Sequence, residues 1–121
     1  MAQSTTIGNL MVNWRGSVGT ANLEYNEQTI LLVLHDVRPP VGDDLNGLPY
    51  VNIFHIDEIN ENTEDAISSL IDMFKPTEFS QITVGGSLAN ENVDFFKEME
   101  FESFPLPGAP SNMRFMLSGA P

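Results

Sequence analysis

The sequence predicts one α/β domain of the α+β type over residues 1–121, with a mixed, largely antiparallel sheet and two helices. Three observations lead to this prediction. Apolar residues alternate along several short segments, which is the period of a half-buried strand. One segment, residues 63–75, repeats apolar residues at helical spacing. A chain of 121 residues with 41% hydrophobic residues is long and apolar enough for one buried core.

The N-terminal half is predicted to form four strands, at residues 7–14, 18–25, 29–37 and 51–59. Leu10, Val12 and Trp14 share one face of the first strand. Gly16 lies in the turn to the second strand, so these two strands should form a hairpin. The last two strands are apolar on both faces, as expected for strands covered on both sides. Prolines and glycines predict a long loop at residues 38–49.

The C-terminal half is predicted to alternate helices and strands. Apolar residues at i, i+3, i+4 and i+7 mark a helix over residues 63–75, which Asn62 or Thr63 would cap. A second, shorter helix would begin at its own cap, Asn90. A stiff apolar loop is expected at residues 105–110. The remaining strands are expected at residues 81–85, 101–104 and 112–117, which gives the order β-β-β-β-α-β-α-β-β.

The charge of the chain is strongly negative. It has 17 acidic residues against 5 basic ones, for a net charge of -12. Binding to nucleic acid or to an anionic membrane needs clustered cations, so the sequence predicts neither. The acidity fits two interpretations: it keeps the protein soluble, or it docks on a basic protein. The basic residues are scattered along the chain, at Arg15, Arg38, Lys75, Lys97 and Arg114.

Other features of the composition suit a soluble cytoplasmic protein, which is the predicted location. The chain has no cysteine, which excludes disulfides, thiolate metal sites and cysteine nucleophiles. The first residues lack the basic and apolar regions of a signal peptide. No apolar run reaches the ~20 residues that a membrane-spanning helix needs.

The C-terminal part of the chain carries a family pattern. Its matching stretches are Ile56-Asp57-Glu58-Ile59, the helix 63–75, Ile82-Thr83-Val84, Asn90-Glu91-Asn92, Phe95-Phe96-Lys97-Glu98-Met99-Glu100-Phe101 and Met113-Arg114-Phe115-Met116-Leu117. Over about residues 50–118 this pattern resembles the GCN5-related N-acetyltransferase family. The resemblance implies an acetyltransferase-like sheet, with Glu58 at a strand position that is often a general base.

The chain departs from that family where the chemistry lies. Family members hold acetyl-coenzyme A on a Gly-rich loop before the helix, but residues 60–65 contain no glycine, no cation and three carboxylates. These carboxylates would repel a pyrophosphate. Phe96 stands where the family often has a tyrosine acid, and Glu100 replaces a glycine. No cofactor is therefore predicted, and no catalytic residue is assigned outside the alternative that Glu58 acts as a base.

The two histidines and two groups of carboxylates are the candidate metal ligands of the sequence. The two histidines, His35 and His55, lie on predicted strands, where each can pair with a neighbouring carboxylate, Asp36 or Asp57. Asp57, Glu58 and Glu61 offer oxygen ligands, but neighbours on a strand point to opposite faces. The same objection applies to Asp43-Asp44. Gly85-Gly86-Ser87 lacks the rest of a phosphate-loop motif. No metal site is predicted.

The function predicted from the sequence is a non-catalytic, regulatory protein-binding module. In fold it would be similar to the ornithine decarboxylase antizymes, which act by binding another protein. One version is an acidic inhibitor of a basic or nucleic-acid-binding protein, and a homodimer through an edge strand is a second partner hypothesis. The alternative is a divergent acyl-CoA-dependent N-acetyltransferase. The predicted partner-binding residues are Asp57, Glu61, Glu64, Asp65, Glu98, Glu100 and Glu102.

Overall fold

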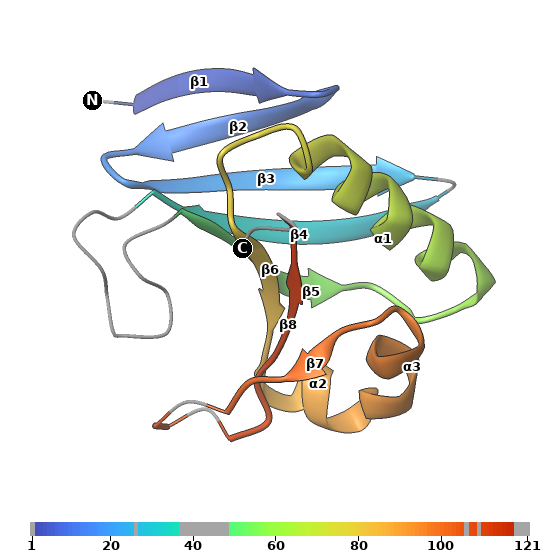
Figure 1. Cartoon of the computed structure of the whole chain (residues 1–121). Helices are drawn as coiled ribbons and strands as arrows, with labels where there is room; N and C mark the ends of the chain where they lie inside the picture. Colours follow the sequence, from blue (N-terminus) through green and yellow to red (C-terminus); the bar gives the residue numbers. More distant parts are fainter. Residues whose placement is uncertain (1, 26, 37–48, 106, 109, 118–121) are drawn as a thin grey trace.

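A computed structural model of the chain describes residues 2–25, 27–36, 49–105, 107–108 and 110–117. These residues form an α+β structure with one mixed sheet of eight strands and three helices (Figure 1). In chain order the elements are β1 (Ala2–Ile7), β2 (Leu10–Arg15), β3 (Val18–Tyr25), β4 (Gln28–His35), β5 (Tyr50–Ile56), α1 (Glu61–Phe74), β6 (Gln81–Val84), α2 (Gly86–Glu91), α3 (Val93–Glu98), β7 (Glu102–Ser103) and β8 (Met113–Met116).

The strands follow the order β1-β2-β3-β4-β5-β6-β8-β7 across the sheet. Neighbouring strands are antiparallel except β5 and β6, which run parallel. A parallel pair needs a crossover, and α1 supplies it between these two strands. The predicted α+β class and largely antiparallel sheet are confirmed, while the predicted element order differs at both ends of the chain.

The first difference is an extra N-terminal hairpin. The predicted strand 7–14 is wrong, because Ile7 ends β1 and Leu10 begins β2, with Gly8 and Asn9 as the turn. Gly8 has a φ of 61°, a conformation that suits glycine at the first central position of a two-residue hairpin turn. The segment before it has no apolar alternation, because Gln3 to Thr6 are exposed and polar. Sequence periodicity could not reveal this strand.

The second difference concerns the helices. Asn60 caps α1, rather than Asn62 or Thr63: its side-chain oxygen accepts a hydrogen bond from the Asn62 N–H at 2.8 Å. The predicted helix capped by Asn90 is instead two short helices, because α2 already begins at Gly86. Asn92 separates α2 from α3 with a non-helical ψ of 33°.

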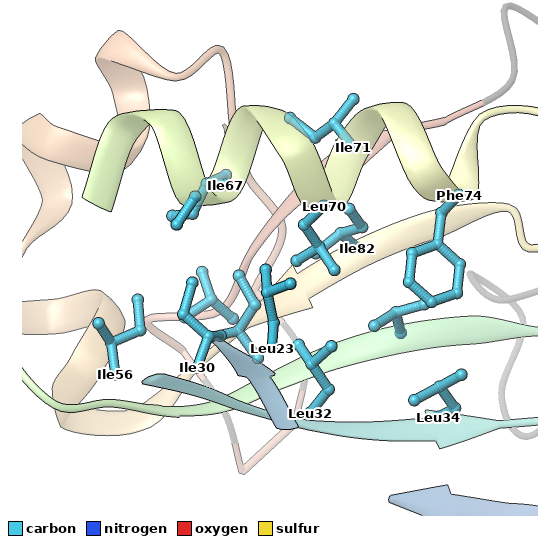
Figure 2. Packing of buried hydrophobic residues seen from close by; sticks show 14 of the residues in the cluster. Leu23, Ile30, Leu32, Leu34, Ile56, Ile67, Leu70, Ile71, Phe74 and Ile82 are labelled. Carbon is cyan, nitrogen blue, oxygen red and sulfur yellow. The ribbon is translucent and has the colours of Figure 1, made fainter. Parts of the chain in front are cut away.

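The core lies between α1 and one face of the sheet. Leu70 and Phe74 point from α1 toward Leu32 and Leu34 of β4 (Figure 2). Alternate residues of β4 are fully buried, while those between them are only partly covered. Strand β4 was predicted to be covered on both faces. The structure buries the inner face under α1 and covers the outer face only partly.

Two predicted loops are only partly seen. Within the loop predicted at residues 38–49, residues 38–48 lie outside the described residues. The described members of the loop at 105–110 form no helix or strand. Among the described helices, none combines the length and apolar character needed to cross a bilayer.

His35 gives the stability of the protein a pH dependence. Its ring stacks on Tyr50 at 4.6 Å between centroids, and burial lowers the pKa of His35 below its usual 6.5. Between the lowered pKa and 6.5 the unfolded chain binds more protons, so stability falls as the pH drops through this window. The urea concentration at the unfolding midpoint should therefore fall between pH 7.5 and pH 5.5, and we expect this fall to be smaller in His35→Phe than in the unmodified chain. An equal fall in both proteins would contradict this account.

Candidate functional site

A hollow of about 560 Å³ lies at the carboxyl ends of the parallel strands β5 and β6. Beyond these ends the chain leaves β5 toward α1 and leaves β6 toward α2, so the two strands diverge (Figure 1). Such divergence at the carboxyl ends of parallel strands is a recurrent ligand-binding place in α/β sheets. The walls are formed by residues 52–59 on one side and by residues 85–88, Glu91 and Asn92 on the other.

A β-bulge shapes the β5 wall of the hollow. Leu31 pairs with His55 and Leu32 with Ile53, so Phe54 has no partner on β4. The extra residue shifts the alternation, which leaves both Ile53 and Ile56 buried. Phe54 follows the regular alternation after Ile53 and lies on the open face, with 66% of its surface exposed, the largest value among the exposed large apolar side chains of the described residues; the shift brings His55 onto the same side.

The lining of the hollow is acidic. Asp57, Glu58 and Glu91 all line it, and no lysine or arginine is among its lining residues. The predicted strand 51–59 is too long: β5 ends at Ile56, so Asp57 and Glu58 follow the strand and do not lie on it. His55 is the one basic neighbour in the lining, with its Nε2 3.7 Å from Asp57 Oδ1.

A buried hydrogen-bond network holds the loop that carries Glu58. The Gln28 side chain, 3% exposed, donates from Nε2 to the Glu58 carbonyl at 2.7 Å. Thr63, fully buried, donates its hydroxyl to Gln28 Oε1 at 2.7 Å and accepts from the Asn60 N–H at 2.8 Å. Asn60 also donates from Nδ2 to Glu58 Oε2 at 2.9 Å. These bonds therefore hold the start of β4, the start of α1 and the Glu58 part of the hollow's lining in fixed positions relative to one another.

Removing Gln28 from this network should destabilise the fold. Gln28→Met keeps the length of the side chain but removes both of its hydrogen bonds, and the Thr63 hydroxyl and the Glu58 carbonyl, 3.0 Å apart, are left with one bond between them. Buried groups that lose a partner cost about 1–3 kcal/mol, so we expect a loss of that size in the free energy of unfolding, measured by urea denaturation. The control is Gln3→Met, at an exposed position, which should change stability by less than about 0.5 kcal/mol. Equal effects of the two variants would contradict the role of the network.

The structure separates the predicted partner-binding residues into groups. Asp57 lines the hollow, and Glu61 and Glu64 lie in the first turn of α1. Asp65 instead lines a second, smaller hollow of about 420 Å³, which lies between Tyr25 of β3 and several residues of α1.

The three remaining predicted residues lie on other elements. Glu98 is exposed at the end of α3, and Glu100 follows it with a φ of 72°, a strained conformation for a residue other than glycine. Glu102, on β7, is paired with Arg114 at 2.8 Å. Arg114 also lies 4.0 Å from the centroid of the Phe104 ring. Glu102 therefore already has a cation within its own chain.

The metal candidates do not come together. His35 pairs with Tyr50 at one end of β5, while His55 is at the other end beside the hollow. Within the described part of the chain, no three histidine or acidic side chains are grouped so that they could hold a metal ion. Asp43-Asp44 lies outside the described residues. Gly85-Gly86-Ser87 lines the hollow, at the start of the six-residue helix α2.

Phe54 and Glu91 line the hollow but are not among the predicted partner-binding residues. Phe54 belongs to a strand predicted to be apolar on both faces, and the structure leaves its face of that strand open. Glu91 lies far from Asp57 in sequence and reaches the hollow through the crossover and β6. A pattern within one strand cannot reveal either position.

Comparison with known proteins gives no relative to draw on: no family model matches the chain, and neither a curated protein nor a solved structure matches it.

Proposed function

We propose that this protein is a non-catalytic binding module that receives a basic side chain of a partner protein in the acidic hollow, with an apolar residue beside it packing on Phe54. The observation that carries the proposal is that three carboxylates line the same hollow as a phenylalanine that is 66% exposed. A regulatory protein that covers a basic surface of its partner would fit this arrangement.

The charges of the hollow favour a cationic guest. Two unit charges 4 Å apart attract by about 4 kcal/mol at the effective dielectric typical of pairs near a protein surface, before the cost of desolvation. Arginine and lysine of the partner can meet Asp57, Glu58 and Glu91 there without competition from a lysine or arginine of the lining. Because these interactions are exposed in part, salt should weaken them.

Phe54 supplies the apolar part of the recognition. A large aromatic side chain on the surface contributes most to binding when it is surrounded by polar groups that exclude water. Phe54 is next to His55 and shares the hollow with the partly buried Ile59 and Leu88. A partner with an apolar residue beside its cation should therefore bind more tightly than one with charge alone.

The acetyltransferase-like fold also belongs to this proposal. Its support is the connectivity from β5 onward: strand, helix, strand, short helices and two final strands, as in the resembling family. The start of α1, where the resembling family holds its cofactor, is unfavourable for a phosphate. The N–H groups of Asn62 and Thr63 already bond to Asn60, and the first turn carries the carboxylates of Glu61 and Glu64. Phe96 is fully buried, which suits a core residue and not a proton donor.

Peptide binding tests the proposal. The probes are three nine-residue peptides labelled with a fluorophore: one alternating Arg and Leu, one alternating Arg and Ser, and one alternating Glu and Leu. Fluorescence anisotropy should give the lowest dissociation constant for the Arg–Leu peptide, about tenfold below that of the Arg–Ser peptide, with no binding of the Glu–Leu peptide. Equal binding of the two arginine peptides would show that charge alone acts and would overturn the role of Phe54.

The alternative function, a divergent acyl-CoA-dependent N-acetyltransferase, has one observation in its favour. Glu58 lines the hollow beside Gly85 and Gly86, as a base next to a bound substrate would.

A thermal unfolding scan separates the two functions. The binding module predicts no rise in the unfolding midpoint with millimolar acetyl-coenzyme A, because the hollow and α1 start are acidic. A ligand at about 100 times its dissociation constant would stabilise the fold by about 2.7 kcal/mol, which is easily seen. A clear rise, together with turnover that Glu58→Gln abolishes, would establish the enzyme instead.

A further inference from the structure

The two edges of the sheet differ in how well they are protected against pairing. In the described part of the chain, β1 ends the sheet on one side and β7 on the other. Strand β7 is two residues long, carries the Glu102–Arg114 ion pair and is followed closely by Pro105. A very short strand, a charge and a nearby proline are features by which proteins keep an edge from pairing.

Strand β1 has none of these features. It pairs with β2 along six residues without a bulge, from Ala2 opposite Arg15 to Ile7 opposite Leu10. Its sequence, Ala-Gln-Ser-Thr-Thr-Ile, contains no charge and no proline. Every second residue of an edge strand directs its N–H and C=O away from the sheet, so β1 presents a regular row of unpaired donors and acceptors.

The charge distribution explains why a second copy is a suitable partner for this edge. Two molecules of net charge -12 repel each other unless they meet where the charge is low. Between Ala2 and Arg15, the β1–β2 hairpin carries one charged residue, Arg15 itself, and no carboxylate. A basic partner, in contrast, would find no carboxylate on this hairpin; Asp36 and Glu78, which share a hollow with Gln3 and Thr5, belong to other segments.

We propose that two copies of this chain pair through β1, antiparallel across a two-fold axis, and continue their sheets into one. A two-fold interface requires that β1 of one copy pair with β1 of the other. An uncharged strand can do this in the antiparallel direction without bringing like charges together. The main-chain groups supply the hydrogen bonds, as in other cases of strand addition. This inference stands on the sheet edge and does not depend on the function proposed for the hollow.

The pairing has a consequence for the whole assembly. The hollow is at β5, four strands away from β1, so both hollows stay open in the dimer. At about 4.8 Å between strands, the hollow is roughly 20 Å from the shared edge. A partner with two basic sites could then be held by both copies, which raises the overall affinity without any new contact.

Sedimentation velocity of the full chain between about 1 and 200 µM tests the proposal, with Ser4→Lys as the variant. A lysine on the edge should raise the dimer dissociation constant at least tenfold, although it lowers the net negative charge. The matched control is Thr20→Lys. Ser4 pairs with Asn13 and Asn13 with Thr20, so both substitutions lie on one face, but Thr20 is two strands inside the sheet. The control should dimerise like the unmodified chain.

Three outcomes would overturn the proposal: a monomer at every concentration, a dimer that Ser4→Lys leaves unchanged, or a dimer that Thr20→Lys weakens equally. Fluorescence of Trp14, the single tryptophan, shows whether the β1–β2 hairpin of each variant is folded. Hydrogen exchange on the unmodified chain gives a second test that needs no substitution. The amides of Gln3 to Thr6 should exchange more slowly at 200 µM than at about 2 µM, and equal exchange would contradict pairing at β1.

Discussion

Phe74→Ala should lower the free energy of unfolding by about 3–5 kcal/mol, the largest stability effect that we expect from a single substitution in this chain. Phe74 is fully buried at the end of α1 and meets the edge of the Phe79 ring at 5.2 Å between centroids. Removing the ring leaves a cavity between α1 and the sheet, and domains of this size have only about 5–15 kcal/mol of stability.

Urea denaturation of Phe74→Ala and Phe54→Ala provides the comparison. The two substitutions delete the same ring, but Phe54 is 66% exposed and Phe74 is fully buried. We expect Phe54→Ala to cost less than about 1 kcal/mol, because little apolar surface is buried there. A small effect of Phe74→Ala would mean that α1 does not pack on the sheet as described.

Asp57→Asn combined with Glu91→Gln should weaken binding of the Arg–Leu peptide by about 100-fold. Each lost charge-assisted hydrogen bond is worth about 1.5 kcal/mol in a partly enclosed hollow, and 1.4 kcal/mol corresponds to a tenfold change. Both side chains are exposed, so the free energy of unfolding should hardly change. Anisotropy titrations at low and at physiological salt measure the effect.

The control is a second pair of substitutions, Glu24→Gln with Asp72→Asn. It removes the same two charges from exposed positions on β3 and α1, outside the lining of the hollow. Its dissociation constant should stay within about twofold of that of the unmodified chain. If both pairs weakened binding equally, the net charge and not the hollow would be responsible.

Much of the fold follows from the sequence where periodicity is strong. The apolar spacing of α1 and the alternation in β3 predicted these elements and their buried faces, because packing against a core requires one apolar side. The N-terminal strand was missed because Gln3 to Thr6 bury no apolar side chain. The second helix was misread because its break at Asn92 is set by backbone conformation, which composition does not reveal.

The candidate site was predicted less completely than the fold. Asp57 was predicted as a partner-binding residue and Glu58 only as the base of the alternative function, because charge is visible in a sequence; both line the hollow. Their place in one hollow with Glu91 depends on the α1 crossover, and the exposure of Phe54 depends on how little of the outer face of β5 is covered. Both are properties of tertiary structure.

The location of a bound peptide tests the central claim most directly. An Arg–Leu peptide carrying a nitroxide spin label would broaden the amide NMR signals of residues close to it. We predict that broadening concentrates on residues 54–58 and 86–92, the two walls of the hollow. Broadening centred on Asp65 to Asp72, or spread evenly over the acidic surface, would contradict the proposal that this hollow receives the partner.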